Sequence, residues 1–227
     1  MNARWKVDLH SHTLWSKDCL TQFETIIRLC RQRGVDRIAI TDHNTAQGAL
    51  AMQQIAPDLV IVGEEIMTTQ GEILAYFVRE SVPAGLTPLE TIRRLRDQGA
   101  VISVSHPFDR LRKGAWHEHE LLEFVDQLDA IEVFNARCLF PEDNAKALAF
   151  AQAHGLPFTA GSDAHSRPEY GQATLLLPPF HDAESFRAAL RSAEVAGRLS
   201  LPYVHGFSTA SKWAKKLGLR QRLWEGG

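Results

Sequence analysis

The chain has 227 residues, of which 44% are hydrophobic and 23% are charged, and its formal net charge is −2. This composition is ordinary for a globular protein with a sizeable core, and the charge provides no overall attraction to nucleic acid or to an anionic membrane. The sequence shows no apolar signal-peptide region and no bilayer-spanning stretch. Its three cysteines form no Cys-X-X-Cys pair, which argues against a disulfide framework and favours a cytoplasmic protein.

Short apolar runs alternate with amphipathic helical patterns through most of the chain. KVDLH, DRIAITDH and DLVIVGEEI predict the first three strands, with a helix expected before the second and before the third. GEILAYFV predicts a fourth strand, joined to the third by the turn-prone TTQG. AVISVSHP, AIEVFN and LPFTAGSDAH predict three more strands with helices between them. This alternation indicates an α/β protein with a largely parallel sheet, and the length suits a single α/β barrel.

Residues 1–200 are expected to form this one barrel domain. Residues 201–227 differ in composition, because they contain the basic and weakly amphipathic stretch SKWAKKLGLRQRLW. We expect this C-terminal tail to be a packed helix or a surface segment.

Histidines and carboxylates stand at or near the carboxyl ends of five predicted strands. They are His10 and His12, His43, Glu64 and Glu65, His106, and Asp163 with His165, while Asp18 follows in the loop after the first pair. In α/β barrels this end of the strands carries the active site. Nitrogen and oxygen ligands without thiolate suit zinc, manganese or iron, with magnesium as a further option. So many candidate ligands predict two or three divalent ions, bridged by Glu65.

The motifs DLHSHT, TDHN, GEEI, SHP and GSDAH, in this order, resemble the PHP (polymerase and histidinol phosphatase) superfamily from about Lys6 to about Gly171. The resemblance implies a distorted (β/α)7 TIM-like barrel, usually three divalent ions, and in many stand-alone members phosphoesterase activity. It implies that His10, His12, Glu65 and Asp163 hold an ion and the metal-bound hydroxide that attacks phosphorus. The remaining metal positions would be completed by Asp18, His43, His106 and His165.

Two positions depart from the pattern of the family. Where some relatives have a further histidine after Glu65, this chain has Glu72. Where histidinol-phosphatase-like members use a histidine on the sixth strand, it has Glu132 and Asn135. Glu72 and Glu132 are therefore candidate ligands of a variant third metal position. Asp42, which precedes a ligand histidine, is expected to lie outside the ligand set.

The charge of the predicted centre indicates the substrate. Two or three divalent ions carry more charge than three carboxylates return, and the excess suits a phosphate. Arg137, Arg110 and Asn135 are candidate substrate ligands, since the arginine fork matches two phosphate oxygens; Arg112 and Lys113 follow with less weight. We expect a small phosphorylated metabolite or nucleotide as substrate. A long nucleic acid is not expected, because the basic tail after Lys212 has no evident route to the metals.

Two other functions stay open on these residues. An amidohydrolase-type C–N hydrolase also uses His-X-His and a late aspartate, although no lysine stands where a bridging carbamate would form. A non-catalytic metal-binding PHP module is the second alternative. No obligate protein partner is evident from the sequence. Of the other histidines, His117 and His119 are expected at a solvated helix start, whereas His205 is a candidate to approach the site from the tail.

Overall fold

The computed structural model describes residues 4–217 of the chain, so residues 218–227 of the predicted tail lie outside the described part. The strands are β1 (Trp5–Asp8), β2 (Arg37–Ile40), β3 (Val60–Met67), β4 (Glu72–Tyr76), β5 (Val101–Val104), β6 (Ile131–Asn135), β7 (Phe158–Gly161), β8 (Ala173–Leu177) and β9 (Glu194–Gly197). The α-helices are α1 (Phe23–Arg33), α2 (Gln47–Ile55), α3 (Pro88–Asp97), α4 (Glu118–Leu122), α5 (Pro141–Ala153), α6 (Ala183–Leu190) and α7 (Val204–Lys216).

Seven of the strands hydrogen-bond in the order β5-β4-β3-β2-β1-β8-β9, and β6 pairs in parallel with β7. Strands β1, β2 and β3 are parallel, whereas β4 is antiparallel to both neighbours because a short turn joins it to β3 without a helix. The first and last strands of the barrel meet at their ends. There the Leu9 amide donates to the Ala160 carbonyl (3.2 Å), and the Asp163 amide donates to the His10 carbonyl (2.7 Å).

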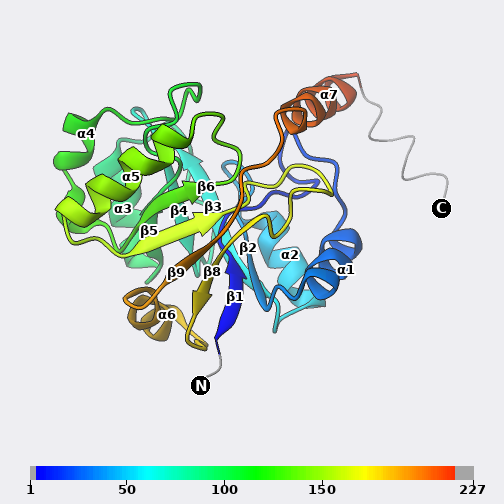
Figure 1. Ribbon diagram of the computed structural model, residues 1–227, viewed down its shortest axis with the longest axis horizontal. Helices are drawn as coiled ribbons and strands as arrows, with labels where there is room; N and C mark the ends of the chain where they lie inside the picture. Colours follow the sequence, from blue (N-terminus) through cyan, green and yellow to red (C-terminus); the bar gives the residue numbers. More distant parts are fainter. Residues whose placement is uncertain (1–3, 218–227) are drawn as a thin grey trace.

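Strands β1 to β7 therefore form a curled, distorted barrel with helices outside it, which confirms the predicted α/β fold class (Figure 1). Strands β8 and β9 extend the sheet beyond β1 with antiparallel pairing and were not among the predicted strands. They were missed because the parallel βα pattern that guided the prediction ends at β7.

Local sequence signals account for the helix boundaries. In α1, Ile26 and Cys30 are buried on one face, and Gly34 ends the helix in the left-handed conformation (φ 62°). The side chain of Thr87 accepts a hydrogen bond from the Glu90 amide at the start of α3.

His117 and His119 are exposed at the start of α4, as predicted. Among the described residues, no helix is long and apolar enough to cross a membrane.

The two ends of the barrel differ in chemistry. Phe180 and Phe186, from α6 and the segment before it, pack with Val7, Ile61 and other apolar strand residues. In Figure 1, α6 lies near the amino-terminal ends of the strands, and α7 lies at the opposite end. The apolar packing thus closes one end of the barrel and leaves the carboxyl ends of the strands to polar side chains.

Barrel closure depends on a glycine at the end of β7. A Cβ atom at Gly161 would lie 2.2 Å from the Cβ atom of His10 and 2.5 Å from its backbone nitrogen. We expect Gly161→Ala to push β7 away from β1 and to lower the free energy of unfolding by roughly 1–3 kcal/mol. Denaturant unfolding measures this. The control is Gly206→Ala in α7, where a Cβ meets nothing within 4 Å and alanine favours the helix. Equal stabilities would contradict this account of closure.

Candidate metal centre

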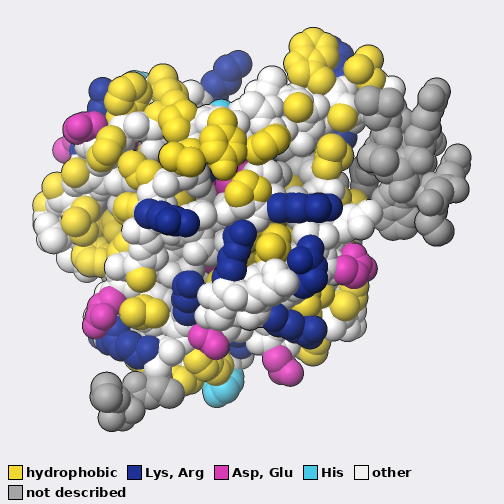
Figure 2. Space-filling view, turned by 45° about the vertical axis from the view of Figure 1, so that its right-hand side comes forward, with side chains coloured by type: hydrophobic (Ala, Val, Ile, Leu, Met, Phe, Trp, Pro, Cys, Tyr) yellow, Lys and Arg dark blue, Asp and Glu magenta, His cyan; other side chains and the backbone are white. Residues whose placement is uncertain are grey.

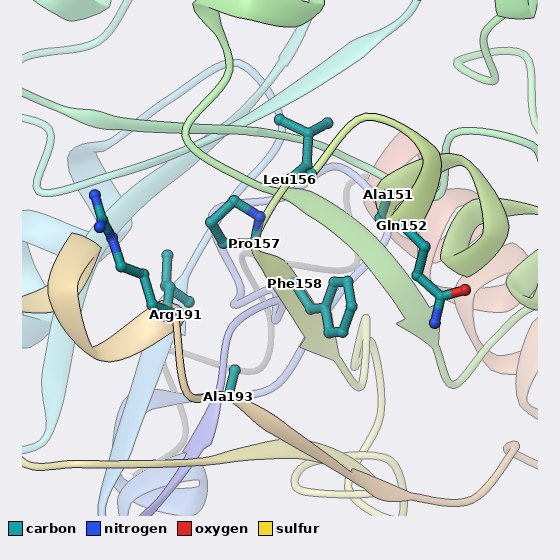
Figure 3. Close-up of a pocket in the computed structure, with 9 residues that line it drawn as sticks. Ala151, Gln152, Leu156, Pro157, Phe158, Arg191 and Ala193 are labelled. Carbon is teal, nitrogen blue, oxygen red and sulfur yellow. The ribbon is translucent and has the colours of Figure 1, made fainter.

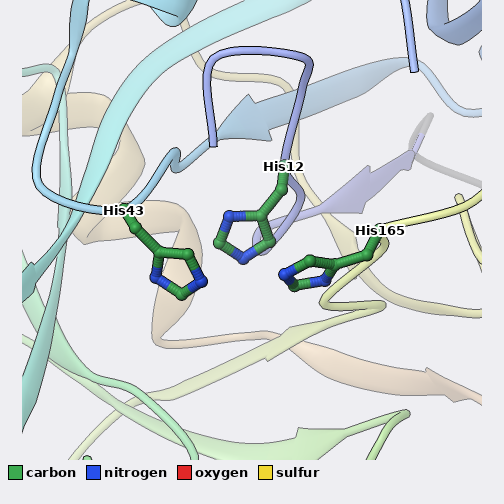
Figure 4. A group of neighbouring side chains, drawn as sticks. All are labelled: His12, His43 and His165. Atoms are coloured by element: carbon green, nitrogen blue, oxygen red, sulfur yellow. The ribbon is translucent and has the colours of Figure 1, made fainter. Parts of the chain in front are cut away.

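All eight predicted metal ligands meet at the carboxyl end of the barrel. Those that follow strands are His10 and His12 (after β1), His43 (after β2), His106 (after β5), and Asp163 and His165 (after β7), while Glu65 lies within β3 and Asp18 in the loop before α1. Seven of the eight are buried, and the side chain of His43 is 10% exposed. Figure 4 shows the imidazole rings of His12, His43 and His165 converging from three separate segments of the chain.

The Glu65 carboxylate lies at the middle of the cluster. Its Oε1 atom is 3.1 Å from His106 Nε2 and 3.3 Å from His10 Nε2, and its Oε2 atom is 2.9 Å from His43 Nδ1. The neighbouring Glu64 points elsewhere, and its Oε2 atom accepts a hydrogen bond from the Val82 amide. Of this pair, Glu65 alone has the placement that a bridging ligand requires.

Asp163 presents its two oxygens to different partners. Oδ1 faces the imidazoles, 3.2 Å from His12 Nε2 and 3.7 Å from His10 Nε2. Oδ2 accepts hydrogen bonds from the Arg112 guanidinium and from Asn135 Nδ2 (3.3 Å). Asp163 and His106 also have positive φ angles, 50° and 26°. Such backbone conformations are costly for residues other than glycine and cluster at functional sites.

Hydrogen bonds at Nδ1, made to Glu132, to Ser16 and to a backbone carbonyl, orient three of the rings. His10 Nδ1 lies 3.0 Å from Glu132 Oε1, His12 Nδ1 lies 3.0 Å from Ser16 Oγ, and His165 Nδ1 lies 2.8 Å from the Asp163 carbonyl. In each ring the Nδ1 contact leaves Nε2 turned toward the cluster, an arrangement typical of metal-binding histidines.

The same contacts place Glu132 and Asp42 around the ligands. Besides contacting His10, Glu132 accepts hydrogen bonds through Oε2 from the His106 amide (2.6 Å) and from Asn135 (3.1 Å). Its carboxylate is thus occupied by protein groups, and the structure gives it a positioning role in place of the predicted ligand role. Asp42 accepts a hydrogen bond from Ser16 Oγ (2.8 Å) and so supports His12 from outside the cluster.

The cluster has the donor atoms that divalent ions require. Three groups each bring ligand atoms within 4.8 Å of one another: His12, His43 and His165; His10, His12 and Asp163; and His43, Glu65 and Glu72. Six of the eight predicted ligands also have a buried nitrogen or oxygen without a hydrogen-bond partner, namely His10, His12, Asp18, Glu65, His106 and Asp163. Unpartnered buried polar atoms are costly, and bound cations would remove this cost. The residues therefore fit a metal centre, in which Glu72 has the place of a further ligand.

The charged and titratable side chains of the cluster strongly shift one another's pKa values. Burial alone lowers the pKa of His10 and His43, but Glu65 and the other nearby carboxylates outweigh it and raise the pKa of His43 to about 10. Burial together with the imidazoles of His165 and His43 holds the pKa of His12 well below its usual value. His12 is thus neutral, as a ligand must be, whereas protons compete with metal ions at His10 and His43. Lower pH therefore weakens metal binding.

The predicted substrate ligands are placed differently from one another. Arg110 pairs with Asp143 (2.6 Å), and its side chain is 57% exposed. Arg137 is buried and contacts Glu169 (3.3 Å) and Ser208 (3.0 Å). Asn135 is also buried and holds the carboxylates of Asp163 and Glu132, which is a positioning role.

Two basic residues reach the cluster: Arg112, which the sequence ranked below Arg110, and Lys212, which it did not predict at the site. Arg112 contacts Asp163. Arg110 and Arg112 share the loop after His106, so no local signal in the sequence could have ranked one above the other. Lys212 Nζ, on α7, lies 3.3 Å from Asp18 Oδ2. The expectation that the basic tail has no route to the metal ligands is therefore wrong. His205, also on α7, approaches the site only through Arg137, 3.5 Å away.

A separate pocket of about 510 Å³ lies at the other end of β7, lined by Leu156, Pro157 and Phe158 among others (Figure 3). The length of β7 separates it from Asp163 and His165. Arg191 is the one charged residue among its lining residues, so it lacks the acid, base and ligand groups of an active site.

Comparisons with known proteins agree with this geometry. The PHP domain family matches residues 8–129, and the family described as PHP-associated matches residues 141–195. An uncharacterized protein of Methanocaldococcus jannaschii is 37% identical over 171 residues, which are 74% of this chain and 68% of that protein. The chain belongs to the PHP domain family.

Solved structures share the fold at lower identity. PsfC from Pseudomonas syringae superposes with a TM-score of 0.70 at 18% identity, over 94% of this chain and 99% of that one. A two-domain Bacteroides vulgatus protein containing a predicted PHP-like metal-dependent phosphoesterase gives 0.69 at 19%, over 87% and 66%. The lesion-specific endonuclease PfuEndoQ from Pyrococcus furiosus gives 0.59 at 15%, over 85% and 58%. This chain thus spans less than two thirds of the last two proteins.

Neighbouring glutamates provide a matched test of the metal centre. We expect the purified protein, loaded with manganese, zinc or iron, to hold more than one equivalent of metal. Glu65→Gln should lower this content, because the variant removes a charge that faces four imidazoles. Glu64→Gln should leave it unchanged, because burial already raises the pKa of Glu64 to about 8 and the amide is nearly isosteric. Elemental analysis after dialysis decides the matter, and equal metal content in both variants would refute the assignment of Glu65.

Proposed function

We propose that the protein is a metal-dependent phosphoesterase that hydrolyses a small phosphorylated metabolite or nucleotide. The observation that carries the proposal is the cluster of five imidazoles and three carboxylates, six of which have a buried unpartnered polar atom, bordered by the cations Arg112 and Lys212. Bound divalent ions would supply an activated water and positive charge for the phosphate oxygens. Membership of the PHP domain family, and a phosphoesterase-containing structure among its neighbours, support this class of reaction.

The residues of the chain have separate tasks in this proposal. His10, His12, Glu65 and Asp163 would hold metal together with Asp18, His43, His106 and His165. Arg112 keeps Asp163 Oδ2 occupied, so that Oδ1 stays turned toward the imidazoles. The Arg112 side chain is 22% exposed, which leaves part of its guanidinium fork for the oxygens of a bound phosphate.

The basic residues of the site favour a small substrate over a long nucleic acid. Within residues 4–217, the basic side chains that contact the cluster are Arg112 and Lys212. Two cations suffice for one or two phosphates, whereas a nuclease must hold several backbone phosphates along a basic track. The endonuclease among the structural neighbours makes long oligonucleotides a necessary part of the test.

A substrate panel tests the proposed function. Protein loaded with manganese, zinc or iron should hydrolyse small phosphomonoesters or nucleotide diesters much faster than amides or single-stranded oligonucleotides. Hydrolysis in heavy-oxygen water, followed by mass spectrometry, should place solvent oxygen in the phosphate. Faster cleavage of amides would indicate a C–N hydrolase, and faster cleavage of long oligonucleotides a nuclease. A fully metal-loaded protein without activity on the panel would indicate a non-catalytic module.

Two arginines of one loop give a second test. Arg112→Ala should raise the KM for the best phosphoester by about ten- to a hundredfold, because charge-assisted hydrogen bonds contribute roughly 1.5–3 kcal/mol. Arg110→Ala should have a much smaller effect, because that guanidinium is bound to Asp143. Steady-state kinetics with parallel metal analysis separates substrate binding from metal loss. Equal effects of the two substitutions would refute the role given to Arg112.

A further inference from the structure

Helix α7 lies over the carboxyl end of the barrel and is fastened there by one of its faces. Ser208 accepts a hydrogen bond from Arg137 (3.0 Å), and Lys215 donates to the backbone carbonyls of Leu14 (2.8 Å) and Ser16. Val204 and Ser211 are buried on the same side, and Lys212 reaches Asp18. The helix is thus attached both to the loop that carries Asp18 and to Arg137 beyond β6.

The adjoining face of α7 forms the wall of a pocket of about 640 Å³. Phe207, Ala210 and Ala214 recur at helical spacing along this wall. Leu20, before α1, and Pro168, after β7, contribute to the other sides. His165, a predicted metal ligand, also lines the pocket, so the pocket lies directly beside the metal centre.

The chemistry of the pocket is that of a small-molecule site. Its volume lies in the usual range for such sites, which combine apolar walls with a few polar groups. Leu20, Pro168 and Phe207 supply apolar surface, and Thr21 and Gln22 supply hydroxyl and amide groups. No carboxylate lies among its lining residues, and the exposed Arg167 is the one arginine or lysine there. Phe207 is 48% exposed, and Figure 2 shows hydrophobic side chains gathered on the surface at the end of the molecule where α7 lies.

We propose that this pocket receives the organic part of the substrate, a group that carries a planar ring, while its phosphate binds at the metal centre. The assignment rests on the proposed phosphoesterase function. His165 borders both spaces, so an ester held at the cluster extends its organic group past His165 toward Phe207. The apolar side chains of Leu20, Pro168 and Phe207 favour the burial of a ring, and the half-exposed Phe207 offers a surface on which the ring can stack. Helix α7 is therefore a specificity element of the active site.

Substitutions that fill the pocket test the proposal through ligand affinity, without a measurement of activity. Benzylphosphonate and methylphosphonate share a non-hydrolysable phosphate-like head and differ by a ring, so calorimetry on metal-loaded protein isolates the contribution of the ring. The unaltered protein should bind benzylphosphonate at least roughly tenfold more tightly, as expected for burial of a ring. Ala210→Phe should abolish this preference without changing the affinity for methylphosphonate. Thr209→Phe is the control, because Thr209 is exposed on α7 and does not line the pocket.

A second variant covers the case in which a bulky residue detaches α7. Thr25→Phe fills the pocket from α1 and should abolish the same preference, with a parallel rise in KM for phenyl phosphate but not for methyl phosphate. An undiminished preference in both filled variants would overturn the pocket assignment alone. Failure of the unaltered, metal-loaded protein to bind either phosphonate would overturn the proposed function. A dimer that Ala210→Phe dissociates would assign this face to a second copy of the chain instead.

Discussion

The rest of the structure depends on one interaction, the contact of the buried Glu65 carboxylate with four imidazoles. Burial of a charged carboxylate is unfavourable unless opposite charge or donors surround it. Here His10 and His43 outweigh that penalty and hold the pKa of Glu65 well below its usual range. These partners come from the ends of separate strands, so the carboxylate is stable only if the barrel closes. Because a buried carboxylate needs positive charge nearby, the cluster also favours the binding of cations.

The two ends of the barrel have different tasks: one is packed with apolar residues, and the other holds the polar residues of the site. Apolar residues around Phe180 and Phe186 fill the end nearest the amino termini of the strands, whereas the opposite end holds unpartnered ligand atoms. Closure between β1 and β7 brings His10 against Gly161 and sets the strained backbone at Asp163. Hydrogen bonds from Glu132 and Ser16 then orient the rings of His10 and His12. Packing at one end thus supports a costly arrangement of polar groups at the other.

Helix α7 changes what the site can recognise. Without it, the cluster would be a polar surface at the mouth of a barrel, suited to phosphate but indifferent to the group attached. Lys212 of this helix contacts Asp18, and the apolar face of the helix lines the pocket that His165 also borders; in the function we propose, this pocket receives the remainder of the substrate. In this proposal α7 selects the organic group of the substrate, whereas the residues of the family motifs form the metal centre.

The sequence by itself determined the α/β class and the placement of the ligand residues. Short-range patterns specify strands, and the carboxyl ends of parallel strands share one end of a barrel. The resemblance of GEEI to a family motif that reads Gly-X-Glu likewise favoured Glu65 over Glu64. Only the tertiary structure decided that Glu132 orients His10, that Arg112 reaches Asp163 while Arg110 turns to Asp143, and that Lys212 meets Asp18. These contacts join residues far apart in the chain through loops and a C-terminal helix, whose paths depend on packing that no local pattern encodes.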